Sequence, residues 1–205
     1  MAKAPKNRTP AKKTYVFDDI LSKGIRAGQV PARTQDARKW FRDTARKTTV
    51  APNTQMSGDP GRLRNKVAMG RMYAFFYDPK HKKTLPYYDR FPLIFPVQPA
   101  PGGFLGMNLH YLPLPLRAKM MDALYNVTSN ERFDQSTRLK LTYNLLQAAT
   151  KGIFKPTIKH YLSAHVKSRF LLIEAAEWDI ALFLPTERFD GASKTKVWKD
   201  SRAMI

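Results

Sequence analysis

The stretch PLIFPVQPAPGGFLGMNLHYL (92–112) decides the fold, because it holds two short apolar runs separated by glycines. PLIFPV (92–97) is typical of a short strand, and its flanking prolines suit a sheet edge or a barrel rim. FLGMNLHYL (104–112) predicts a second strand after Gly102-Gly103. A hairpin connection explains these glycines better than a phosphate-binding loop, which would need a lysine and a hydroxyl downstream.

An aromatic run precedes this pair. VAMGRMYAFFY (67–77) favours a further strand that ends at Asp78-Pro79, where a turn is expected. Three or more strands with one packed face are needed for independent stability. The runs together therefore predict a small curved antiparallel sheet or a barrel.

Helical periodicity takes over after Pro113 and Pro115. In the first of these segments, Leu116, Met120 and Leu124 fall on one face, as in a helix that packs back on a sheet. Helices are predicted over residues 116–127, 136–149, 155–170, 174–182 and 192–202. Because the strands precede a cluster of helices instead of alternating with them, we expect an α+β fold.

Charge is the outstanding bulk property of the 205 residues: 36 Lys and Arg against 16 Asp and Glu give a formal net charge of +20. Nucleic acid is the commonest counter-surface for such an excess, because neutralising phosphates releases condensed counterions. An anionic membrane, an acidic partner protein and ribosomal RNA are the alternatives. The chain has no cysteine, which excludes disulfides, thiolate metal sites and cysteine nucleophiles.

The charge is concentrated towards the N-terminus, where residues 1–71 hold 17 Lys and Arg against 5 Asp and Glu. This part is poor in apolar periodicity and rich in proline and glycine, apart from an amphipathic helix expected over 34–47. That helix is either a surface helix anchored by Trp40 and Phe41 or a phosphate contact. We predict a basic N-terminal arm with one amphipathic helix (1–66) and a compact α+β domain (67–205).

The sequence shows no convincing enzymatic signature. His160 and His165 are five residues apart, so on a helix they point away from each other, unlike a metal-binding pair. Glu174, Glu177 and Asp179 stand at a predicted helix start, where carboxylates complement the helix dipole. We therefore predict a protein that is not an enzyme, with no catalytic residue, metal, cofactor or small-molecule substrate.

Basic clusters interleaved with aromatic residues remain as candidates for binding. In the 80–91 loop, lysines are placed to contact phosphates while Tyr87 or Tyr88 stacks on an exposed base; alternatively, these tyrosines are core residues. Any duplex contact should be independent of sequence, because no base-reading motif is present. The residues predicted to bind nucleic acid or a partner are Lys12, Lys13, Arg38, Lys39, Arg42, Arg46, Lys47, Arg62, Arg64, Lys66, Lys80, Lys82, Lys83, Tyr87, Tyr88, Arg90, Lys194, Lys196 and Lys199.

Neither a signal peptide nor a membrane span is expected. The first ten residues are basic and polar, and no window approaches 18 uninterrupted apolar residues. We therefore expect a soluble protein that has no membrane partner and is not secreted through a signal peptide.

Four blocks of the sequence are similar to a known family. They are YDPKHKKTLPYYDRFPLIFPV (77–97), GGFLGMNLHYLPLPLRAKMMDALY (102–125), EWDIALFLPTERF (177–189) and ASKTKVWKDSR (192–202). Over about residues 67 to 202 the chain resembles the DNA end protector protein family of T-even-like tailed phages. The resemblance implies a virion protein that joins the particle late, near the portal or neck, after assembly in the host cytoplasm. It would shield the ends of packaged double-stranded DNA from host exonuclease, and it carries over no catalytic residue.

A second hypothesis belongs to another class. The chain would then be a structural neck, tail or baseplate component, whose basic arm clamps neighbouring subunits and whose charge matches acidic partners. Its position in the intact virion distinguishes the two hypotheses.

Overall fold

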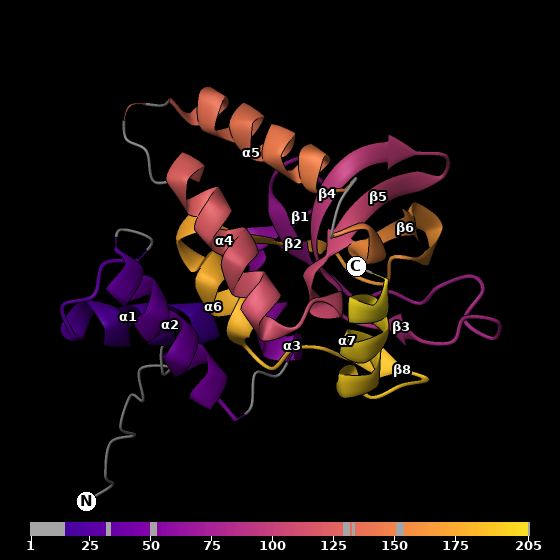
Figure 1. Ribbon diagram of the computed structural model, residues 1–205, viewed down its shortest axis with the longest axis horizontal. Coiled ribbons are helices and arrows are strands. Elements are labelled where there is room, and N and C mark those ends of the chain that lie inside the picture. The colour runs from indigo at the N-terminus through magenta and orange to yellow at the C-terminus, as the bar shows by residue number, and fades with distance from the viewer. Residues whose placement is uncertain are drawn as a thin grey trace, which may run out of the picture.

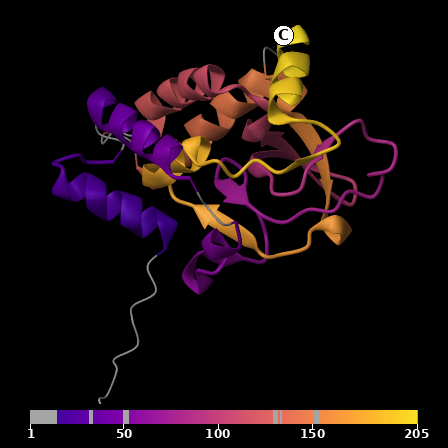
Figure 2. The ribbon, with the colours of Figure 1, turned by 90° about the horizontal axis from the view of Figure 1, so that it is seen from below.

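The computed structural model describes residues 15–31, 34–49, 53–128, 132, 134–150 and 154–204. Figures 1 and 2 show helices gathered on one side of an antiparallel sheet. The sheet has six strands in the order β1-β7-β2-β4-β5-β6, and a separate pair is formed by β3 and β8. The strands are β1 (Leu63–Arg64), β2 (Met72–Ala74), β3 (Tyr88–Asp89), β4 (Leu93–Ala100), β5 (Gly103–Asn108), β6 (Ile158–Leu162), β7 (Phe170–Ile173) and β8 (Phe189–Asp190).

The helices lie before, between and after these strands. They are α1 (Val16–Arg26), α2 (Gln35–Lys47), α3 (Asn53–Met56), α4 (Leu114–Thr128), α5 (Gln135–Thr150), α6 (Trp178–Phe183) and α7 (Lys194–Ala203). The predicted α+β class is confirmed. Of the two sheet forms left open, the curved sheet is the observed one, because β1 and β6 are free edges and the sheet does not close into a barrel.

The β4–β5 hairpin is the one predicted from the glycine pair. Gly102 turns the chain with φ 71°, a left-handed conformation that favours glycine. Gly103 is required for a different reason: a Cβ there would lie 1.8 Å from the carbonyl oxygen of Tyr161 in β6. The two glycines thus fix both the turn and the close pairing of the next strand.

Side chains alternate between the two faces of the sheet, as strand geometry requires. On one face, residues such as Leu93 and Phe95 pack with the helices in the larger core cluster. The opposite face is aromatic, and its rings pack against one another beneath the strands. Its buried members are Tyr73, Phe75, Tyr77, Ile94, Phe104, Tyr161, Phe170 and Leu172. Val67 and Val166, from the links before β2 and before β7, pack against this face.

One predicted helix is wrong. Residues 155–170 form β6, two short 3-10 turns and the approach to β7. Tyr161 pairs with Phe104 across the β5–β6 ladder and enters the aromatic cluster, which a helix would not allow. Tertiary pairing here overrides the local pattern. β7 then inserts between β1 and β2, so two strands of the six-stranded sheet, β6 and β7, follow the helices α4 and α5 in the chain.

Part of the predicted N-terminal arm is folded. Lys12 and Lys13 lie outside the described residues, but α1 and α2 pack on the body in Figures 1 and 2. Phe17 and Phe41 are each 2% exposed and belong to the same core cluster as α6. Sequence reasoning missed α1 because Gly24 interrupts its pattern; yet a Cβ at Gly24 would lie 2.3 Å from the Phe41 ring, so the glycine serves helix packing.

Candidate nucleic-acid interface

The aromatic face of the sheet opens into a hollow of about 590 Å³, which we call the sheet hollow. Two chain segments and the tip of the β4–β5 hairpin form it: the link from β1 to β2, and the link from β6 to β7. Its lining residues are Asn65, Lys66, Val67, Met69, Pro99, Gly103, Phe104, Ser163, Val166, Lys167, Ser168, Arg169 and Phe170.

The charged residues of the sheet hollow are Lys66, Lys167 and Arg169, and no carboxylate is among its lining residues. Lys66 and Lys167 are exposed, and neither forms a salt bridge within the described part of the chain. Arg169 is held in place: its Nε donates to Asn65 Oδ1 at 3.0 Å, and its Nη2 donates to the Leu63 carbonyl at 2.9 Å. The rim is therefore cationic and accessible, as a phosphate-binding surface requires.

Below this rim, Phe104 and Phe170 form part of the floor. Their ring centroids are 6.0 Å apart at an interplanar angle of 66°, and the rings are 5% and 8% exposed. Val67 and Val166 extend the apolar surface. The sheet hollow thus combines a cationic rim with an apolar floor.

Hydrogen bonds to Phe76 and Tyr77, in the segment after β2, hold the loop after β6 in place. The Phe76 amide donates to Ser168 Oγ at 2.9 Å, and the Lys167 amide donates to the Phe76 carbonyl at 2.8 Å. A further bridge joins Tyr77 and Val166. The backbone that carries Lys167 is thus fixed before any ligand arrives.

Sequence reasoning found Lys66 but missed Lys167 and Arg169. Both missed residues fell inside the helix that was wrongly predicted over 155–170. The dense Lys167-Ser168-Arg169 triplet was the available signal. Only the pairing of β6 with β5, and of β7 with β1 and β2, brings it beside Lys66, about a hundred residues earlier.

Several of the predicted binding residues are engaged inside the protein. Arg38 is 3% exposed and contacts Asp122 and Asp179 at 2.7 and 3.0 Å, so it has no surface left for a phosphate. Arg42 contacts the same two aspartates at 2.9 and 2.6 Å. These ion pairs fasten α2 to α4 and α6, which corrects the prediction of phosphate contact for Arg38.

Arg62 is similarly engaged. It forms ion pairs with Asp18, Asp59 and Glu177 and thereby joins the segment before β1 to α1 and to the turn before α6. Arg64 is exposed and donates to the carbonyls of Gly61 and Leu63.

The 80–91 loop keeps some of its charge free. Lys82 pairs with Asp78 at 2.8 Å, whereas Lys80 and Lys83 are exposed without a salt bridge among the described residues. Arg90 lies 3.7 Å from Asp190. No residue of this loop lines the sheet hollow, although Asp78, just before the loop, is hydrogen-bonded to His165 beside that lining.

The two tyrosines of this loop are half-buried. Tyr88 donates its hydroxyl hydrogen to Asp190 at 2.9 Å, and the Tyr87 ring packs 6.0 Å from Tyr111. These contacts favour the alternative that both rings are structural. Stacking on a base stays a prediction.

The remaining predicted cations lie on helices α2 and α7. Lys39, Arg46, Lys47 and Lys199 are exposed and have no salt bridge within the described ranges. Lys196 pairs with Asp200 at 3.0 Å, and the Lys194 ammonium lies over the Trp198 ring at 5.7 Å. The structure thus divides the predicted residues between internal ion pairs and several exposed patches.

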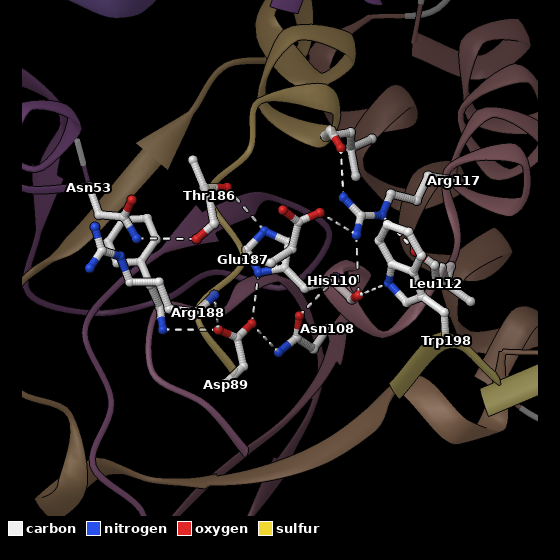
Figure 3. Close-up of polar contacts among 12 residues, drawn as sticks. Asn53, Asp89, Asn108, His110, Leu112, Arg117, Thr186, Glu187, Arg188 and Trp198 are labelled. Carbon is white, nitrogen blue, oxygen red and sulfur yellow. Dashed lines mark hydrogen bonds and ion pairs between the residues drawn. The ribbon is translucent and has the colours of Figure 1, made fainter. Parts of the chain in front are cut away.

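A buried polar cluster lies beneath β3 and the segment before β8 (Figure 3). Asp89 Oδ2 contacts His110 Nδ1 at 2.7 Å, and His110 Nε2 contacts Thr186 Oγ1 at 3.1 Å. This order of acid, imidazole and hydroxyl is the pattern of a nucleophilic triad. The three residues are, however, only 4%, 0% and 2% exposed, and none of them lines a described cavity.

The cluster is satisfied internally. Asp89 also accepts hydrogen bonds from the Asn108 side chain and from the Phe91 amide, at 3.1 and 3.0 Å. Both ring nitrogens of His110 have a partner, Asp89 at Nδ1 and Thr186 at Nε2. With every member paired and sealed from solvent, the arrangement stabilises the fold and offers no substrate access.

Arg117 extends this cluster towards α7, as Figure 3 shows. It is fully buried, donates to the carbonyls of Leu112, Leu182 and His110, and pairs with Glu187 at 2.7 Å. Burial lowers the pKa of Arg117, an effect that Glu187 opposes. Burial by itself would raise the pKa of Glu187, but the Arg117 guanidinium and nearby groups outweigh it and lower that pKa.

The described residues contain no group of His, Asp and Glu placed to hold a metal ion. Their helices are too short or too polar to cross a membrane. Glu174 and Glu177, considered above as a carboxylate cluster, form a capping box at the turn before α6.

Fold and surface together define a class of protein: a strongly basic, cysteine-free α+β protein. Its His110 cluster is buried, and Lys66, Lys167 and Arg169 line an open hollow on its surface. The chain belongs to a phage family, described as Phage T4 terminal DNA protecting protein, whose family model matches residues 3–202. This confirms the resemblance found in the sequence. Searches of curated proteins and of solved structures gave no match.

Proposed function

We propose that this protein binds the ends of double-stranded DNA and shields them by occlusion. The observation that carries the proposal is the sheet hollow, where three cations and no carboxylate surround an aromatic floor. The family name, which refers to protection of terminal DNA, supports it. Lys66, Lys167 and Arg169 would contact phosphates next to the terminus, while Phe104 and Phe170 lie under the last base pair.

The mechanism needs no bond to be made or broken. An exonuclease must engage the free end, so a folded body seated on that end blocks it sterically. Exposed lysines outside the sheet hollow, among them Lys80 and Lys83, would add affinity along the duplex without reading its sequence. The sealed state of the Asp89, His110 and Thr186 cluster supports a non-catalytic role.

We further propose that the protein acts as a virion component near the portal or neck, where the end of packaged DNA lies, after assembly in the host cytoplasm. Membership of a phage family supports the virion assignment. The alternative of a structural neck, tail or baseplate component is tested by the same localisation: symmetric copies at the tail tip would contradict a position at the DNA end.

The central experiment compares two DNA substrates of one sequence, a blunt linear duplex and a covalently closed circle. We expect the protein to bind the linear form more tightly than the circle. We also expect a double-strand exonuclease to digest the linear form more slowly when the protein is present than when it is absent. Lys66→Glu/Lys167→Glu should abolish both effects. Equal affinity for the two substrates would refute end recognition.

The matched control is Lys119→Glu/Lys140→Glu, which makes the same change in charge at exposed positions of α4 and α5. It should lose some overall affinity but keep the preference for ends. If it loses that preference as fully as the sheet-hollow variant, general charge and not this hollow is responsible.

A further inference from the structure

A second hollow lies where α2, α4 and α7 meet, and we call it the α2–α7 groove. It has a volume of about 360 Å³, and in Figure 1 α4 lies between the two other helices. It is lined by Lys39, Arg42, Asp43, Arg46, Pro113, Leu114, Pro115, Ala118, Phe183, Trp198 and Arg202. The sheet hollow shares none of these residues.

The floor and walls of this groove are apolar. Leu114 and Ala118 come from the first turns of α4, Phe183 from the end of α6 and Trp198 from α7. The Trp198 indole is held in position, because its Nε1 donates to the His110 carbonyl at 2.8 Å. A preformed apolar slot of this kind accepts a side chain without first having to order itself.

The rim is cationic. Lys39, Arg46 and Arg202 are exposed and form no salt bridge among the described residues, and Asp43 is the one carboxylate in the lining. Arg42 is neutralised by Asp122 and Asp179 at its base. The groove therefore offers a net positive rim around an apolar slot.

This charge decides between possible occupants. The chain's own first 14 residues carry five Lys and Arg and no Asp or Glu, so they are repelled by the rim. A second copy, with its net charge of +20, is disfavoured for the same reason. Duplex DNA has the right charge but no apolar group that fills a slot between Leu114 and Trp198. An acidic peptide with an apolar side chain satisfies both requirements.

We propose that the α2–α7 groove binds an acidic segment of another protein, with carboxylates on Lys39, Arg46 and Arg202 and an apolar side chain beside Trp198. The site is distinct from the sheet hollow, so one molecule would hold a partner protein and a DNA end together. The proposal stands on its own geometry and does not depend on DNA binding.

The test uses the full-length protein and a fluorescein-labelled synthetic peptide of aspartate, glutamate and one central phenylalanine. The comparison peptide has asparagine and glutamine in place of the acids. Fluorescence anisotropy should show saturable binding of the acidic peptide and at least about tenfold weaker binding of the neutral one. Lack of saturable binding by the acidic peptide would overturn the proposal.

Variants locate the binding. Lys39→Glu/Arg46→Glu/Arg202→Glu should reduce affinity for the acidic peptide at least about tenfold. The control Lys119→Glu/Lys140→Glu/Lys155→Glu changes three exposed lysines outside both the groove and the sheet hollow. It has the same total charge as the groove variant and should reduce the affinity for the acidic peptide far less. Equal losses in the two variants would mean that overall charge, not the groove, attracts the peptide.

Two further measurements separate the groove from its rivals. Leu114→Ser removes part of the apolar slot. It should lower the affinity for the phenylalanine peptide but not the affinity for a peptide that has alanine in place of that phenylalanine. Binding of blunt duplex DNA should be unchanged in Leu114→Ser and fall no further in the groove variant than in its charge-matched control. A selective loss of DNA binding in the groove variant would assign this surface to DNA and overturn the proposal.

Discussion

The buried cluster around His110 and the sheet hollow around Lys167 are both built from polar and charged side chains, yet the fold uses them in opposite ways. In the cluster, Arg117 and Glu187 are almost fully buried and each finds its partners inside the protein. At the sheet hollow, Lys66 and Lys167 reach solvent and form no salt bridge in the described chain. Charges that are paired inside the fold are costly to leave without their partners, whereas exposed charges without a partner are available to a ligand.

This comparison also explains why residue types alone mislead. The Asp89, His110 and Thr186 side chains have the order of a catalytic triad but no access, whereas ordinary lysines on loops have access and a shaped surface beneath them. Burial, not chemical identity, separates the structural side chains from the proposed binding residues. Substitutions in the two regions should therefore change different measured quantities.

The largest effect is expected from Arg117→Met. It leaves Glu187 buried without its partner and three backbone carbonyls without their donor. The free energy of unfolding should fall by about 3–5 kcal/mol, as measured by urea denaturation. Adding Glu187→Gln should recover part of the loss. A change below about 1 kcal/mol would show that the cluster does not hold the fold together.

The sheet-hollow variant Lys66→Glu/Lys167→Glu should have the opposite profile. Its free energy of unfolding should stay within about 0.5 kcal/mol of the wild-type value, because substitutions at exposed positions change that free energy little. The dependence of DNA affinity on salt should become shallower, with the slope of log K against log salt reduced by about 0.9 for each lost phosphate contact. An unchanged slope would place both lysines outside the interface.

The pH dependence should come from the buried pair. The pKa of Glu187 is lowered in the folded state from its ordinary value of 4.5, so its contribution to stability is present above that value. The contribution is lost as the pH falls through the folded-state pKa. The stability difference between wild type and Glu187→Gln, followed by urea denaturation from neutral to acid pH, should therefore shrink on acidification. A difference that grows on acidification would reverse this assignment.

The smallest effect is expected from Thr186→Val, which removes one hydroxyl group from the His110 contact. The stability should fall by about 1 kcal/mol, the contribution of a typical hydrogen bond. Protection of DNA ends against exonuclease should not change. A loss of function without a loss of stability would indicate that Thr186 has a chemical role.

Much of the fold was readable from local sequence. The hairpin at Gly102-Gly103, the helices beginning near residues 114, 135 and 194 and the α+β class follow from apolar period and turn residues, which are properties of neighbouring positions. The family resemblance was readable for a similar reason, because contiguous blocks of residues carry it. The helix α1 and the strand β6 were missed, since a glycine or a basic surface masks the pattern in each.

The sites were decided by contacts between distant segments. Sequence determined how many cations the chain carries and that no cysteine chemistry is available. It did not reveal that Arg38 and Arg62 form ion pairs inside the protein. It also did not reveal that Lys66 and Lys167 line the same hollow. Whether a charge is buried and paired depends on which residues lie across from it, and only the packed strands and helices set that.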